Sequence, residues 1–96
     1  MGTSPAGSQM TSAFEEILDL ARRLGITVRH ARLGGTGGGG LAKIRGQRQL
    51  FVDLDAAPEE QLDQTVTALA NLEEIDNLFI RPDVRDLLDA AKRRRT

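Results

Sequence analysis

Six of the seven residues from 34 to 40 are glycine, and this run limits the fold more than any other feature. Glycine loses more backbone entropy on folding than any other residue, so the run is not expected inside a helix or a strand. We therefore predict a flexible loop here. The segments on either side are suited to strands, so the loop is expected to connect two of them.

Three short segments have the composition of strands. Residues 26–33 alternate and are rich in β-branched residues, and residues 41–45 and 48–54 flank Gly46-Gln47, which predicts a hairpin with a tight II′-type turn. We expect an antiparallel meander with alternate residues of the last strand in the core. By the same alternation, the opposite face carries cations, an amide and an aromatic ring: Arg29, Lys43, Arg45, Gln49 and Phe51.

The N-terminal part of the chain is expected to contain one helix. Residues 1–10 show no apolar periodicity and are interpreted as a disordered leader to a single domain over 11–96. Apolar residues then recur at helical spacing between a cap at Thr11 or Ser12 and Gly25. Glycine adopts the left-handed conformation that ends helices, so Gly25 is the expected terminus.

Two more helices are predicted after the strands. Asp55 is expected to cap the first, with Pro58 in its first turn, and Pro82 is expected to begin the second. Residues 77–80 fit either a short edge strand or a packed turn. The predicted fold class is α+β, in two layers: three helices on one face of a three- or four-stranded, mainly antiparallel sheet, in the order α-β-β-β-α-(β)-α.

Composition argues against several classes of function. The chain has no cysteine, which excludes disulfides and thiolate zinc sites. No apolar run approaches the ~20 residues of a membrane helix, so a cytoplasmic location and no membrane partner are expected. His30 is the only histidine and cannot alone supply a usual zinc set or catalytic triad. We expect it half-buried beside Val28, and we expect no catalytic residue, cofactor or metal.

Two motifs have competing interpretations. The N–H groups of the Gly34–Gly40 loop could cradle a phosphate, but a strand follows instead of the Gly-Lys-Ser/Thr and helix of a P-loop. The glycines also allow the backbone to run close to a bound peptide or a strand edge, and otherwise the loop is only a connection. Asp53 and Asp55 could be paired carboxylates for catalysis or a cation, or simply a strand end and a helix cap.

Charge is unevenly distributed although the net charge is only −1. Residues 20–52 contain seven cations and no acid, whereas residues 53–91 contain eleven acids and two cations. A basic sheet face with an exposed aromatic ring favours a non-catalytic protein-interaction or dimerisation module, with a protein partner or a second copy bound there. The alternative is a single-stranded nucleic-acid platform on the same face.

The element order resembles that of small bacterial α+β proteins to which we can attach no activity. The residues that carry the resemblance are Leu33-Gly34-Gly35, Gly38-Gly39-Gly40-Leu41, Ile44-Arg45-Gly46, 51–55, 60–62 and 80–85. Leu24-Gly25-Ile26 and residues 50–60 are more distantly similar to the front of ImmA/IrrE-type zinc peptidases. Where that family has His-Glu-x-x-His, this chain has Thr65-Val66-Thr67-Ala68-Leu69, so the resemblance implies a scaffold without metal hydrolysis.

Overall fold

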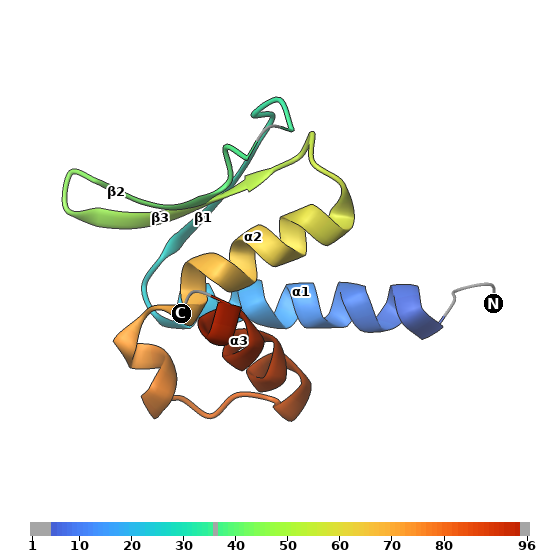
Figure 1. Ribbon diagram of the computed structural model, residues 1–96. Coiled ribbons are helices and arrows are strands. Elements are labelled where there is room, and N and C mark those ends of the chain that lie inside the picture. Colours follow the sequence, from blue (N-terminus) through green and yellow to red (C-terminus); the bar gives the residue numbers. More distant parts are fainter. Residues whose placement is uncertain (1–4, 36, 95–96) are drawn as a thin grey trace.

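The computed structural model describes residues 5–35 and 37–94 (Figure 1). Its elements are α1 (Pro5–Arg23), β1 (Thr27–Ala31), β2 (Gly40–Ile44), β3 (Gln47–Asp53), α2 (Pro58–Ala70), the 3-10 helix η1 (Glu73–Asn77) and α3 (Pro82–Arg94). The described residues thus form an α+β fold with three α-helices and one three-stranded sheet, as the coarse prediction stated.

The sheet is mixed, with the strand order β1-β3-β2. β2 and β3 form the expected antiparallel hairpin, but β1 lies on the other side of β3 and runs parallel to it. The predicted antiparallel meander was therefore wrong. The glycine loop between β1 and β2 crosses the end of β3, which leaves the most buried strand in the centre with neighbours on both sides.

The hairpin turn also differs from the prediction by one residue. Its two central residues are Arg45 (φ 53°) and Gly46 (φ 80°), not Gly46 and Gln47. Positive φ at both positions is the pattern of a type I′ turn, whose twist matches that of the strands. A one-residue shift of register moves every side chain of a strand to the other face, so the predicted faces of β2 are exchanged.

All three helices lie on one side of the sheet (Figure 1). α1 and α2 pack against the strands, while α3 packs mainly against α1 and α2. The core is built from side chains that are essentially inaccessible to solvent, among them Ile17, Leu20, Leu50, Val52, Leu69 and Leu88. The one-sided arrangement was predicted correctly, whereas the packing of the last helix mainly against the other helices was not.

Two segments depart from the predicted boundaries. α1 begins at Pro5, which suits a first helical turn, so residues 5–10 of the expected leader are helical and residues 1–4 lie outside the described part. Residues 77–80 form no strand. The Arg85 guanidinium donates hydrogen bonds to the carbonyls of Ile75 (3.3 Å) and Leu78 (2.9 Å), which satisfies backbone acceptors in this connection without a strand neighbour.

Candidate functional site

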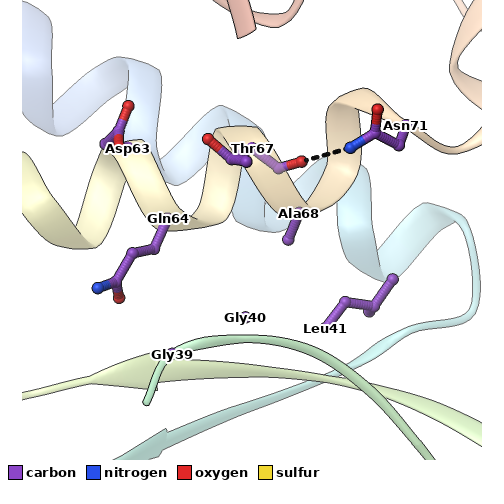
Figure 2. Close-up of a pocket in the computed structure, with 8 residues that line it drawn as sticks. All are labelled: Gly39, Gly40, Leu41, Asp63, Gln64, Thr67, Ala68 and Asn71. Atoms are coloured by element: carbon purple, nitrogen blue, oxygen red, sulfur yellow. Dashed lines mark hydrogen bonds between the residues drawn. The ribbon is translucent and has the colours of Figure 1, made fainter. Parts of the chain in front are cut away.

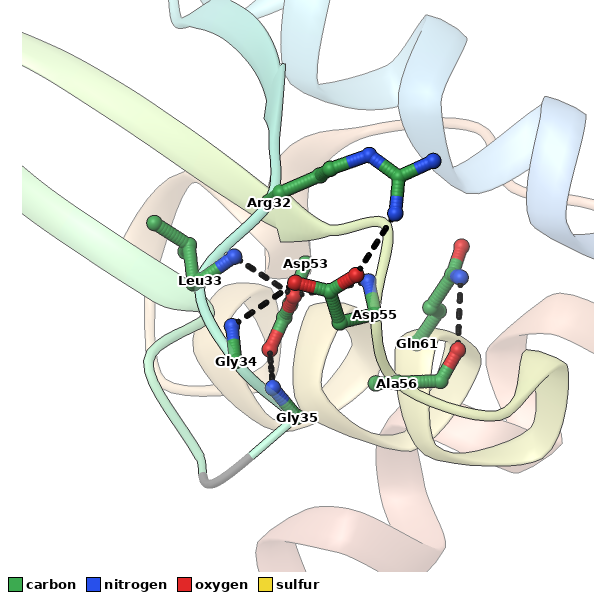
Figure 3. Close-up of polar contacts among 8 residues, drawn as sticks. All are labelled: Arg32, Leu33, Gly34, Gly35, Asp53, Asp55, Ala56 and Gln61. Carbon is green, nitrogen blue, oxygen red and sulfur yellow. Dashed lines mark hydrogen bonds and ion pairs between the residues drawn. The ribbon is translucent and has the colours of Figure 1, made fainter.

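Asp53 closes the end of β3 and is fully buried. Its Oδ1 accepts hydrogen bonds from the N–H groups of Leu33 (2.9 Å) and Asp55 (2.9 Å), and its Oδ2 accepts one from Gly35 (2.8 Å; Figure 3). Burial raises the pKa of Asp53, but these three backbone donors together hold the pKa below its ordinary value. The carboxylate therefore fastens the glycine loop across the end of the central strand.

Asp55 extends the same contact to the surface. Its Oδ2 accepts a hydrogen bond from the Gly34 N–H (3.0 Å), and its Oδ1 pairs with Arg32 Nη1 (2.9 Å; Figure 3). The predicted helix cap at this residue was wrong: the residue before α2 is Ala57, and no side chain caps the helix there. The two carboxylates lie close together, as the spacing suggested, but both bind the loop.

This arrangement weakens the phosphate interpretation of the loop. The N–H groups of residues 33–35 already donate to Asp53 and Asp55, so the first part of the loop binds two carboxylates of its own chain. Within residues 5–35 and 37–94, no cluster of three or more histidine or acidic side chains is arranged to hold a metal ion. The Asp53–Asp55 pair thus holds residues 33–35 in place, and we call this set of contacts the clasp.

The second part of the loop lines a groove between β2 and α2. A Cβ added at Gly39 would displace the movable end of Gln64 and lie 3.1 Å from the Phe51 carbonyl oxygen, so glycine favours the close approach of this segment to α2. The resulting groove of about 390 Å³ is lined by Gly39, Gly40, Leu41, Asp63, Gln64, Thr67, Ala68 and Asn71 (Figure 2). This volume is within the range of sites that bind ligands.

Residues on the groove differ in where they point. Gln64 and Ala68 project from α2 toward β2, whereas Asp63 projects away from the strand (Figure 2). Gln64 Oε1 is the one side-chain polar atom in the described residues that is buried and has no hydrogen-bond partner. Sequence reasoning missed this groove, because Gly39 and Gln64 are distant in the chain and only the fold brings them together.

The predicted interaction residues divide between two faces of the sheet. Arg29, Gln49 and Phe51 share the face without helices: Arg29 is the register partner of Phe51, and Arg29 Nε donates to Gln49 Oε1 (2.7 Å). Lys43 pairs in register with Arg48 on the helix side, and Arg45 lies in the turn, so placing both on the Phe51 face was wrong.

Ala42 and Ile44 occupy the positions on the Phe51 face that were assigned to the two cations. Ile44 is 42% exposed, and Phe51 is half-buried outside the helix-side core. We call Arg29, Ala42, Ile44, Gln49 and Phe51 the helix-free face. The face is consequently more apolar and less basic than predicted.

His30 also lies in a more exposed position than the alternation predicted. Its register partner is the buried Val52, yet His30 itself is exposed, and β1 lies at an edge of the sheet. The expectation of a half-buried imidazole was wrong, and no hydrogen-bond or ion-pair partner for it is found among the described residues.

None of the helices in the described ranges is long and apolar enough to cross a membrane. No protein-family model, curated protein or solved structure matches this chain. The resemblance to the front of the ImmA/IrrE-type peptidases therefore stays a hypothesis about the scaffold, and α2 holds Thr65, Val66 and Leu69 in its buried stripe.

Proposed function

We propose that this protein is a non-catalytic interaction module that binds another protein chain, a second copy included, through the helix-free face. The observation that carries this proposal is that Phe51 and Ile44, at opposite ends of the β2–β3 hairpin, are both partly exposed on the face that the register assigns away from the helix-side core. All three helices lie on the other side of the sheet (Figure 1). An aromatic anchor beside an arginine is typical of the energetic centre of protein interfaces. Arg29, held by Gln49, supplies that neighbour.

Charge supports a partner with an acidic surface. Several acids of the helical layer are already paired within the chain, for example Glu74 with Arg48 (3.0 Å) and Asp76 with Lys92 (3.0 Å). Arg29 has only a neutral amide partner on the helix-free face among the described contacts. A carboxylate of a partner would provide the opposite charge and would speed encounter at low salt.

The test replaces Phe51 by glutamate and compares it with the same change at Phe79, which is 89% exposed in the connection before α3. If the protein self-associates, analytical ultracentrifugation over a wide concentration range should show that Phe51→Glu and Ile44→Glu abolish association while Phe79→Glu does not. For a different partner, the same three variants are compared in an affinity capture. Retained association in folded Phe51→Glu and Ile44→Glu variants would contradict the proposal.

Single-stranded nucleic acid is the second candidate, and the observation that favours it is the placement of Arg29 beside Phe51 on neighbouring strands. Stacking on one aromatic ring next to a cation is how such platforms bind bases. The displacement of Lys43 and Arg45 from this face weakens the candidate. A low-salt gel-shift assay with single-stranded DNA and RNA tests it, and an absence of retardation rejects it.

A further inference from the structure

The outer edge of β2 presents backbone groups that no described strand uses. Ile44 and Gln47 pair across the two-residue turn, so this pair exchanges hydrogen bonds and the pairs alternate from there along the hairpin. Leu41 and Lys43 consequently direct their N–H and C=O groups away from β3. β2 is an edge strand of the sheet, so an extended chain can add beside it as a fourth strand.

The groove lies along this edge on the helix side. Leu41 pairs in register with the buried Leu50, so its side chain is on the helix side of the sheet, and Ala68 points toward β2 across the groove (Figure 2). A residue added beside Leu41 would point the same way and enter the groove. Because Gly39, Gly40 and Ala68 are small, space remains there for an aliphatic side chain.

The groove is short enough to define the length of its occupant. Its helical wall runs from Asp63 in α2 to Asn71, the residue after α2, and a helix rises 1.5 Å per residue, so the groove is about 12 Å long. An extended chain advances roughly 3.3 Å per residue, so three or four residues fill it.

Gln64 contributes an unpaired polar atom beside the groove. Its Oε1 is buried without a partner in the described part of the chain, and such an atom is destabilising unless a donor reaches it. The N–H group of an added strand would supply that donor once the Gln64 amide turns from its position beside Gly39 toward the groove. With its amide turned over, Gln64 would offer a donor to a backbone carbonyl instead, so either orientation suits a peptide.

The charged residues near the groove differ in whether they are already paired. Asp63 is paired with Arg94 (3.1 Å), and Arg48, opposite Lys43, is paired with Glu74 (3.0 Å). Lys43 is exposed and has no ion-pair partner within residues 5–35 and 37–94. It follows Leu41 by two residues, so it lies on the same face. An added strand would place an acidic side chain beside Lys43 if that residue were two positions from the aliphatic one.

We propose that the groove between β2 and α2 binds an extended segment of another protein as an additional strand, and that this segment carries a small aliphatic and an acidic side chain two residues apart. The backbone of the segment pairs with Leu41 and Lys43, its aliphatic side chain contacts Leu41 and Ala68, and its carboxylate meets the Lys43 ammonium. This site is separate from the helix-free face and does not depend on it.

The experiment titrates ¹⁵N-labelled protein with an acetylated, amidated eight-residue peptide that has Val and Glu two apart in a Ser/Thr background. We expect amide shifts concentrated in residues 39–43 and 63–71. Lys43→Glu should weaken binding about fivefold, as expected for an exposed ion pair, and should reverse the preference toward a peptide with Lys in place of Glu. Ala68→Leu should fill the groove and weaken binding about tenfold.

Matched variants make each result specific. Arg45→Glu repeats the charge change two residues further along, in the turn, and Ala90→Leu repeats the enlargement on α3; both should bind the peptide as the unmodified protein does. Phe51→Glu should also bind it normally, which separates this proposal from the helix-free face. A peptide N-methylated at one backbone nitrogen that pairs with β2 should bind about fivefold more weakly than the unmethylated one.

Three outcomes overturn the proposal. The first is an absence of shifts at millimolar peptide. The second is unchanged affinity in an Ala68→Leu variant whose spectrum shows a native fold. The third is a set of concentration-dependent shifts along residues 39–43 without peptide, which would assign the edge to a second copy of the chain.

Discussion

The two parts of the glycine loop use the same residue type for different physical reasons. In residues 33–35 the backbone N–H groups are directed inward, and the carboxylates of Asp53 and Asp55 bind them. At Gly38 and Gly39 the missing side chains matter instead, because an added Cβ would lie 3.1 Å from Leu33 Cβ or 3.1 Å from the Phe51 carbonyl oxygen, respectively. The comparison shows that a glycine run can hold a loop in place at one end and allow a close approach beside a groove at the other.

Removing the negative charge of Asp53 should cause the largest loss of stability. Asp53→Asn keeps the shape of the side chain but replaces one acceptor oxygen by a donor that faces a backbone N–H. We expect the melting temperature to fall by roughly 10 °C, because a buried network of several hydrogen bonds is broken. Thermal unfolding followed by circular dichroism measures this, and a fall of only one or two degrees would contradict the anchoring role.

Adding a side chain at Gly39, where the loop lies close to Gln64, should cause the next largest loss of stability. Gly39→Ala is expected to destabilise the fold by about 1.5 kcal/mol, because the new methyl group would press on the Phe51 carbonyl oxygen and the end of Gln64. Gln64→Ala removes the side chain that the new methyl group would meet. Urea unfolding of both single variants and the double variant completes the cycle, and we expect the double variant to recover part of the loss.

A pair of alanine substitutions sharpens the comparison within the loop. Gly35 and Gly37 both have positive φ (73° and 88°), but a Cβ at Gly35 would lie 3.1 Å from the Asp55 carbonyl oxygen, whereas one at Gly37 would meet nothing within 4 Å. Gly37→Ala should cost about 1 kcal/mol from backbone strain alone, and Gly35→Ala should cost more. Equal losses in urea unfolding would show that the contact at Gly35 is unimportant.

Lowering the pH should weaken the hydrogen bonds that the Asp53 carboxylate accepts from the loop. The pKa of Asp53 lies below its ordinary value of 3.8, so its ionised form stabilises the folded state. This contribution is complete above the ordinary pKa and is lost as pH falls below it, through the lower folded value. Unfolding curves over this acidic range should show a steeper loss of stability for the unmodified protein than for Asp53→Asn. Identical slopes would argue against this assignment.

Removing the exposed ion pair between Arg32 and Asp55 should cause the smallest loss of stability. Arg32 pairs with Asp55, but its side chain is 79% exposed, so solvent screens the interaction. Arg32→Ala should change the free energy of unfolding by less than about 0.5 kcal/mol in urea titrations. A larger loss would mean that the clasp depends on its surface ion pair and not on the buried carboxylate.

These contrasts also explain what could be predicted from the sequence. The hairpin, the three helices and the one-sided sheet follow from local periodicity and turn residues. The parallel pairing of β1 could not be predicted, because it joins segments about twenty residues apart, as do the hydrogen bonds that Asp53 accepts from the loop. The faces of β2 were exchanged because the turn begins at Arg45, a non-glycine residue with positive φ that sequence alone does not favour.

The crossing of the loop over β3 has a consequence for the order in which the molecule opens. β2, β3 and α2 form one continuous stretch, whereas α1 and β1 join it through the parallel seam along β3 and through helix packing. We expect native-state hydrogen exchange to reveal the N-terminal third as a cooperative unit that detaches first. In that case the hydrogen bonds from Leu33 and Gly35 to Asp53 must break before the N-terminal unit detaches, while the hairpin and α2 stay together.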